Sequence, residues 1–137
     1  MRLKFHNKNA LGRLAEQVTK KHLLKKGLEF VVSNYRKPFG EIDLIMKRSG
    51  RIYFFEVKSV SREMSHRLAR GVGRSDTYRP EDNAHPHKLR KLSRVIKVWL
   101  SENDLDESCQ WSFNVVLVYF SRRESKFWVK ILWNVIL

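Results

Sequence analysis

The sequence has very little cysteine and no long apolar run, and each shortage excludes a class of protein. Cys109 is the only cysteine among 137 residues, so no intrachain disulfide can form and nothing requires an oxidising compartment. The first residues, from Met1 to Lys8, lack the apolar core of a signal peptide. No apolar segment approaches the ~20 residues of a membrane-spanning helix. These absences predict a cytoplasmic protein without a membrane span.

Acidic residues are also scarce. The chain has 14 Asp and Glu against 28 Lys and Arg, which gives a formal charge of +14. Such an excess favours a polyanionic partner, and nucleic acid is the first candidate. An anionic membrane surface ranks second, because no segment has the pattern of a basic amphipathic helix with a bulky apolar face. Hydrophobic residues at 42% and aromatic residues at 12% are typical of a globular protein.

The hydrophobic pattern predicts one α/β domain over residues 1–137, with the element order α-β-β-β-α-β-β. Helical periodicity predicts helices over residues 10–26 and 86–100. The expected strands are residues 28–36, 41–47, 51–60, 111–120 and 127–133. Residues 61–84 have no clear period and are expected to form a mobile basic loop. That loop carries Arg62, Arg67, Arg70, Arg74 and Arg79.

Two acidic segments are the most informative feature of the chain. Each places acids inside an apolar, strand-like run, and the runs are Gly40-Glu41-Ile42-Asp43-Leu44-Ile45 and Phe54-Phe55-Glu56-Val57-Lys58. If residues 49 and 50 form a two-residue hairpin loop, Asp43 lies opposite Glu56. The same register places Glu41 opposite Lys58. Side chains alternate between faces along a strand, so these four would share one face.

An opposed pair of carboxylates needs a physical explanation. At a Cβ separation of about 5 Å, Asp43 and Glu56 repel each other unless a cation lies between them. A divalent cation would relieve the repulsion, and Lys58 would stand beside it. The alternative is a solvent-exposed hairpin face, which has to explain why Asp stands in a strand, where it is depleted. A loop with an odd number of residues would move the acids to opposite faces.

An ordered set of motifs covers nearly the whole chain. The set comprises Gly12-x-x-Ala15-Glu16, Asn34-Tyr35-Arg36, Gly40-Glu41-Ile42-Asp43-Leu44-Ile45, Phe55-Glu56-Val57-Lys58, Lys88-Leu89-Arg90-Lys91-Leu92 and Phe113-Asn114-Val115-Val116. In this order the motifs resemble those of the YraN-like family of small bacterial proteins. That family belongs to the restriction-endonuclease-like superfamily, whose members are also called PD-(D/E)xK nucleases.

The resemblance implies a mixed central sheet of about five strands flanked by helices, similar to that of archaeal Holliday-junction resolvases. It also implies a Mg²⁺- or Mn²⁺-dependent endonuclease that hydrolyses phosphodiester bonds in DNA. Asp43 and Glu56 match the metal-binding acids, and Lys58 matches the lysine of the signature. Glu16 matches the helix glutamate that completes the site, and its alternative is an ordinary exposed glutamate. The family more usually has an aspartate where Asn114 stands.

Contacts to nucleic acid are expected from two basic regions. One is the arginine-rich loop, and the other is the basic face of the second helix, where Lys88 and Lys91 lie. A solvated helix face is an equally good interpretation of Lys88. Phosphate contacts of this kind give salt-sensitive affinity without sequence specificity, so branched or damaged DNA is a better candidate substrate than a short defined sequence.

Three hypotheses follow for the function. The first is a metal-dependent endonuclease, expected by analogy with resolvases to act as a homodimer on two strands. The second is a non-catalytic nucleic-acid-binding module on a nuclease-like scaffold, which the positive charge alone would support. The third is a subunit of a larger repair or uptake complex.

Overall fold

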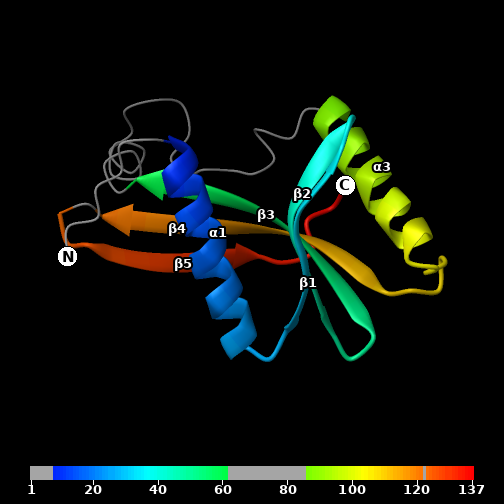
Figure 1. Ribbon diagram of the computed structural model, residues 1–137, viewed down its shortest axis with the longest axis horizontal. Helices are drawn as coiled ribbons and strands as arrows, with labels where there is room; N and C mark the ends of the chain where they lie inside the picture. The colour runs from blue at the N-terminus through cyan, green and yellow to red at the C-terminus, as the bar shows by residue number, and fades with distance from the viewer. Residues whose placement is uncertain (1–7, 62–85, 122) are drawn as a thin grey trace.

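The computed structural model describes residues 8–61, 86–121 and 123–137 (Figure 1). In chain order the elements are α1 (Lys8–Lys25), β1 (Glu29–Lys37), β2 (Gly40–Arg48), β3 (Arg51–Ser61), α3 (Pro86–Glu102), β4 (Trp111–Ser121) and β5 (Lys126–Leu132). The predicted order α-β-β-β-α-β-β is confirmed. The expected basic loop, apart from residue 61, lies outside the described residues.

The five strands form one mixed sheet in the order β1-β2-β3-β4-β5. β1, β2 and β3 are successive antiparallel neighbours, β4 is parallel to β3, and β5 is antiparallel to β4. Parallel neighbours need a crossover connection, and α3 belongs to the connection between β3 and β4. The mixed sheet flanked by helices that the sequence predicts is therefore confirmed (Figure 1).

Each of the two described helices packs on its own hydrophobic cluster. The cluster under α1 contains Ala15, Leu23, Leu28, Leu44, Met46, Phe55, Val116 and Val118. The cluster under α3 includes Ile42, Ile45, Phe54, Leu92, Val95, Ile96 and Trp99. Within the described part of the chain, neither helix has the length and apolar content that crossing a bilayer requires.

The regular alternation of β2 side chains between the two faces of the sheet is interrupted at Asp43. Leu44 packs in the cluster under α1, whereas Ile42 packs in the cluster under α3. Residues two apart share a face in a regular strand, so β2 must twist between these two positions. At the facing position in β1, Asn34 has a left-handed backbone with a φ of 54°. Asparagine tolerates this conformation better than most residues, and the twist places Asp43 between the two faces of the sheet.

Asn114 is fully buried in β4, and both polar atoms of its side chain form hydrogen bonds. Its amide nitrogen donates to the Phe54 carbonyl at 3.2 Å and to the Ser112 hydroxyl at 3.1 Å. Its Oδ1 accepts a hydrogen bond from the Asn134 backbone at 2.9 Å. The side chain thus joins β3 and the segment after β5 to β4, which is a structural role.

Gly40, the first residue of β2, packs closely against α3. A Cβ atom at this position would lie 2.9 Å from Cγ2 of Val95, and that side chain is fully buried and conformationally stiff. We expect Gly40→Ala to lower the free energy of unfolding by about 1–3 kcal/mol, because overpacking forces α3 or β2 to shift. Urea unfolding measures this change.

Gly12→Ala in α1 is the matched control for this substitution. A Cβ atom on Gly12 would meet no described heavy atom within 4 Å. Helix propensity alone predicts that this alanine raises the free energy of unfolding by up to about 1 kcal/mol. Unchanged or increased stability of Gly40→Ala would contradict the close packing of β2 on α3.

Candidate functional site

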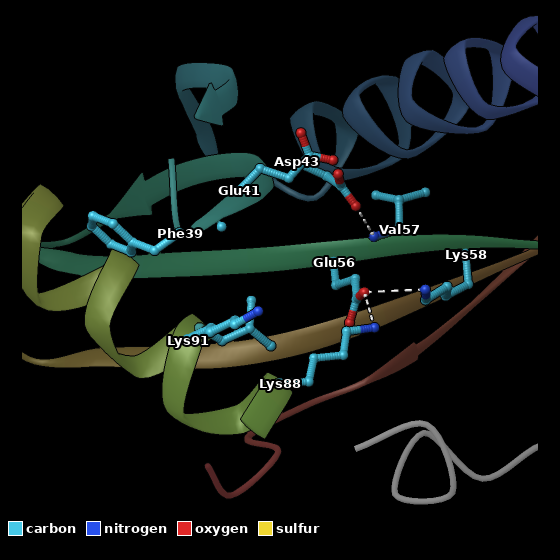
Figure 2. A pocket seen from close by; sticks show the side chains of 10 residues that line it. Phe39, Glu41, Asp43, Glu56, Val57, Lys58, Lys88 and Lys91 are labelled. Atoms are coloured by element: carbon cyan, nitrogen blue, oxygen red, sulfur yellow. Dashed lines mark hydrogen bonds and ion pairs between the residues drawn. The ribbon is translucent and has the colours of Figure 1, made fainter. Parts of the chain in front are cut away.

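β2 and β3 separate where both strands carry acids. The predicted hairpin register is confirmed as far as the pair Leu44–Phe55. The ladder between these described strands ends there, so the expected Asp43–Glu56 strand pair is wrong. The Val57 backbone N–H donates instead to Oδ2 of Asp43 at 2.8 Å (Figure 2). The carboxylate thus accepts the hydrogen bond that a neighbouring strand would otherwise accept from this N–H. This bond holds Asp43 against β3.

Glu56 lies on the α3 face of β3, as does Phe54 two residues earlier. Oε1 of Glu56 lies 3.2 Å from Nζ of Lys58 and 2.9 Å from Nζ of Lys88 (Figure 2). The sequence predicts Lys58 beside Glu56. The sequence does not indicate that Lys88 also reaches this oxygen from the start of α3, because Lys88 is expected only as a phosphate contact.

Asp43 lies in an environment that disfavours its charged form. Burial raises the pKa of its carboxyl group from 3.8 to about 6. The hydrogen bond from Val57 opposes this rise, whereas the negative charges of Glu16, Glu56 and Glu41 add to it. A carboxylate surrounded in this way is costly to ionise, and a bound cation would remove that cost. Perturbed carboxyl groups of this kind are concentrated at functional sites.

Glu16 approaches Asp43 from α1. Burial raises the pKa of Glu16, and a hydrogen bond with the Asn34 side chain opposes the rise. Glu16 and Asp43 line one hollow of about 280 Å³. Glu16 is therefore half-buried beside another carboxylate, unlike an ordinary exposed helix glutamate. The sequence assigns Asn34 no role in the site, although Asn34 is the first residue of the motif Asn34-Tyr35-Arg36, and that motif was the available signal.

Asp43 also lines a second hollow, on the α3 side of the sheet. This hollow measures about 400 Å³, and its lining includes Glu56, Lys58, Lys88 and Lys91 (Figure 2). Asp43 is thus accessible from both sides, with Glu16 on one side and Glu56 on the other. The fold brings the four predicted catalytic residues into one region, and Lys88 and Lys91 border it.

Glu41 does not form the expected strand pair with Lys58. Nε of Arg36 in β1 lies 2.8 Å from Oε2 of Glu41, and both side chains are exposed. An exposed pair of this kind contributes less than about 1 kcal/mol. The prediction of a Glu41–Lys58 strand pair is wrong because the β2–β3 ladder ends before it reaches Glu41.

The predicted phosphate contacts of the basic loop are not addressed by the structure. Five of the residues proposed to bind nucleic acid lie outside the described ranges, namely Arg62, Arg67, Arg70, Arg74 and Arg79. Their roles stay predictions. Lys88 and Lys91 are described, and both lie beside the candidate acids.

The donor chemistry suits a hard cation, although the acids do not form a closed metal cluster. Over residues 8–61, 86–121 and 123–137, no three His, Cys, Asp or Glu side chains lie close enough together to hold a metal ion. Mg²⁺ needs fewer protein ligands than that, because it keeps several waters and uses one or two carboxylates. Asp43 and Glu56 can supply these two. Burial raises the pKa of Asp43, and a cation bound there would favour the ionised carboxylate.

Comparison with known proteins assigns this chain to a family. The model of the uncharacterised protein family UPF0102 matches residues 15–118. A UPF0102 protein of Vibrio parahaemolyticus is 32% identical over 118 residues, which cover 86% of this chain and 88% of the relative. A UPF0102 protein of Aquifex aeolicus is 32% identical over 108 residues, covering 79% and 84%. The chain therefore belongs to the UPF0102 family, which is the YraN-like family predicted from its motifs.

Proposed function

We propose that the protein is a metal-dependent endonuclease of the restriction-endonuclease-like superfamily, which hydrolyses phosphodiester bonds in DNA. The observation that carries the proposal is the position of Asp43. Its carboxyl group is buried between Glu16 and Glu56, and its pKa is raised to about 6. The match of these residues to the nuclease signature and the basic side chains beside them also support it. Branched or damaged DNA is the proposed substrate.

The metal ligands in this proposal are Asp43 and Glu56, with Glu16 holding a second ion or a metal-bound water. Oδ2 of Asp43 accepts the hydrogen bond from Val57, and Oε1 of Glu56 forms ion pairs with Lys58 and Lys88. Asp43 and Glu56 would hold the cation through their carboxylate groups. When bound, Mg²⁺ or Mn²⁺ polarises a phosphoryl oxygen and lowers the pKa of a coordinated water.

The lysines of the site have separate roles in the proposal. Lys58 is half-buried beside Glu56 and would stabilise the negative charge that develops on the phosphate. Lys88 and Lys91 come from α3 on the same side of the sheet and would hold the DNA backbone. Because two copies would present two such sites, a homodimer could cut both strands of a symmetric substrate.

The second candidate function is a non-catalytic nucleic-acid-binding module. One observation favours it: Glu56 already pairs with both Lys58 and Lys88, as it would in a site that has lost its metal. The net charge of +14 explains binding without any chemistry. This candidate predicts salt-sensitive DNA binding that a chelator does not change.

Incubation with plasmid, forked and four-way-junction DNA distinguishes these two candidates. We expect cleavage in Mg²⁺ or Mn²⁺, no cleavage after chelation, and none by an Asp43→Ala and Glu56→Ala double variant. The reason is that the two carboxylates supply the proposed metal ligands. Absence of cleavage by the native protein, or equal cleavage by the double variant, would contradict the proposal.

A further inference from the structure

A third hollow lies near the turn of the β2–β3 hairpin, at the end of α1. It measures about 440 Å³ and is lined by Lys26, Leu28, Arg48, Arg51, Tyr53, Trp133 and Asn134. Three of these described residues are cations, two are aromatic and none is acidic. Arg51 and Glu56 are five positions apart along β3, a distance on the order of 17 Å. The hollow is therefore distinct from the candidate active site, whose lining contains acids as well as lysines.

Among the described residues, the side chains of Arg48 and Arg51 donate hydrogen bonds to uncharged acceptors. Nη1 of Arg48 donates to the Lys26 carbonyl at 3.1 Å, which caps the end of α1. Nη2 of Arg51 donates to Oδ1 of Asn134 at 3.4 Å, and its buried Nε has no acceptor among the described residues. The ion pairs of the described residues include neither arginine. An anion in the hollow would give these arginines a negatively charged partner, which no ion pair of the described residues supplies.

Trp133 offers an aromatic surface next to these cations. Trp133 is 43% exposed. Its ring lies 6.1 Å from Tyr53 and 6.0 Å from Phe55, at interplanar angles of 79° and 72°. Both contacts are edge-to-face, so neither neighbour stacks in parallel on the indole. A flat ring could stack there, and every nucleobase has such a face.

We propose that this hollow binds one nucleotide of an unpaired nucleic-acid strand, with its phosphate at Arg48 and Arg51 and its base stacked on Trp133. Single-strand binding sites combine cations with stacking aromatics in this way. A paired base in a duplex is not free to stack on a side chain. This inference and the proposed function have in common only that the ligand is a nucleic acid. Binding in this hollow does not require that the protein cleave DNA. At about 3.4 Å per stacked nucleotide, about five nucleotides would span the ~17 Å from Arg51 to Glu56.

Fluorescence anisotropy with a labelled oligothymidine of about twelve nucleotides tests this inference. A duplex of the same length is the comparison, and EDTA is present so that cleavage plays no part. We expect Trp133→Leu and Arg51→Gln each to weaken oligothymidine binding about tenfold, because each removes a stacked base or a phosphate contact. Duplex binding should change less than about twofold. Arg51→Gln should also reduce the slope of log affinity against log salt by about 0.7.

Two control variants match these substitutions. Trp128 is also 43% exposed, but its ring stacks in parallel on Tyr119 at 5.8 Å. Lys130 is an exposed cation of β5 outside the hollow. We expect Trp128→Leu and Lys130→Gln to bind oligothymidine as the native protein does. If Trp133→Leu fails to fold, Arg51→Gln decides the outcome.

Three results would overturn the inference. They are unchanged oligothymidine binding by Arg51→Gln, an equal loss with Trp128→Leu, and an equal loss of duplex binding. The outcome is independent of the nuclease proposal. Selective single-strand binding without metal-dependent cleavage would overturn the proposed function and leave this inference intact. Cleavage by a protein whose Arg51→Gln variant binds oligothymidine normally would do the reverse.

Discussion

Replacement of Asp43 by asparagine is expected to raise the free energy of unfolding by up to about 3 kcal/mol at pH 8. Burial and three neighbouring carboxylates raise the pKa of Asp43 from 3.8 to about 6, and one pKa unit corresponds to about 1.4 kcal/mol. Asparagine is uncharged, and its side-chain oxygen can still accept the hydrogen bond from Val57. A substitution that stabilises the fold at a catalytic position is the expected trade-off between stability and activity.

This gain in stability should disappear in acid. The pKa of Asp43 is higher in the folded state than in the unfolded state, so folding favours the protonated form. The stability that this proton contributes is fully present below pH 3.8 and is lost as the pH rises through about 6. The native protein should therefore match Asp43→Asn in stability in acid and fall below it at neutral pH. Urea unfolding at a series of pH values measures the difference.

Asp104→Asn is the control for this prediction. Asp104 is exposed, and its φ of 56° is a conformation that asparagine also tolerates. Its substitution should change the free energy of unfolding by less than about 0.5 kcal/mol at every pH. A loss of stability in Asp43→Asn at pH 8, or a gain that does not depend on pH, would show that Asp43 is not a buried charge.

The same Asp43→Asn substitution is expected to slow metal-dependent DNA cleavage by about 10³-fold and to leave DNA binding intact. A metal contributes several kcal/mol to the transition state, and most of this is lost when a charged ligand becomes neutral. Binding depends on attraction between phosphates and a protein of charge +14, which the loss of a carboxylate does not weaken. Single-turnover cleavage and anisotropy measure the two effects separately.

Glu107→Gln serves as the control, because it removes a similar charge from an exposed position between α3 and β4. We expect this variant to cleave and bind as the native protein does. Cleavage by Asp43→Asn at the native rate would exclude Asp43 as a metal ligand. A loss of binding as large as the loss of cleavage would assign Asp43 to DNA contact rather than to chemistry.

The hairpin that carries the candidate site could be predicted from local sequence. Ser49 and Gly50 have φ values of 50° and 76°, as a two-residue hairpin loop with the twist of its strands requires. Such a loop fixes the register, and every pair from the turn to Leu44–Phe55 follows from it. The apolar stripe of α3 was equally predictable, because Leu92, Val95 and Ile96 repeat at helical spacing.

The grouping of the acids could not be predicted in the same way, because it depends on contacts between distant segments. A regular hairpin would place Asp43 and Glu56 on one face. The structure instead twists β2 at Asp43, opposite the left-handed Asn34, and ends the ladder there. The approach of Glu16 depends on the packing of α1, and the Lys88–Glu56 ion pair depends on where α3 begins. A single strand pattern contains none of this information.

The most direct test of the site is the pKa of Asp43 itself, measured by NMR titration of its carboxyl carbon without and then with Mg²⁺. We predict a pKa of about 6 without the metal, because the group is buried among like charges. Mg²⁺ at saturation should lower this pKa, because a bound cation favours the ionised form. A pKa near 3.8 without metal, or one that Mg²⁺ leaves unchanged, would contradict a cation site at Asp43.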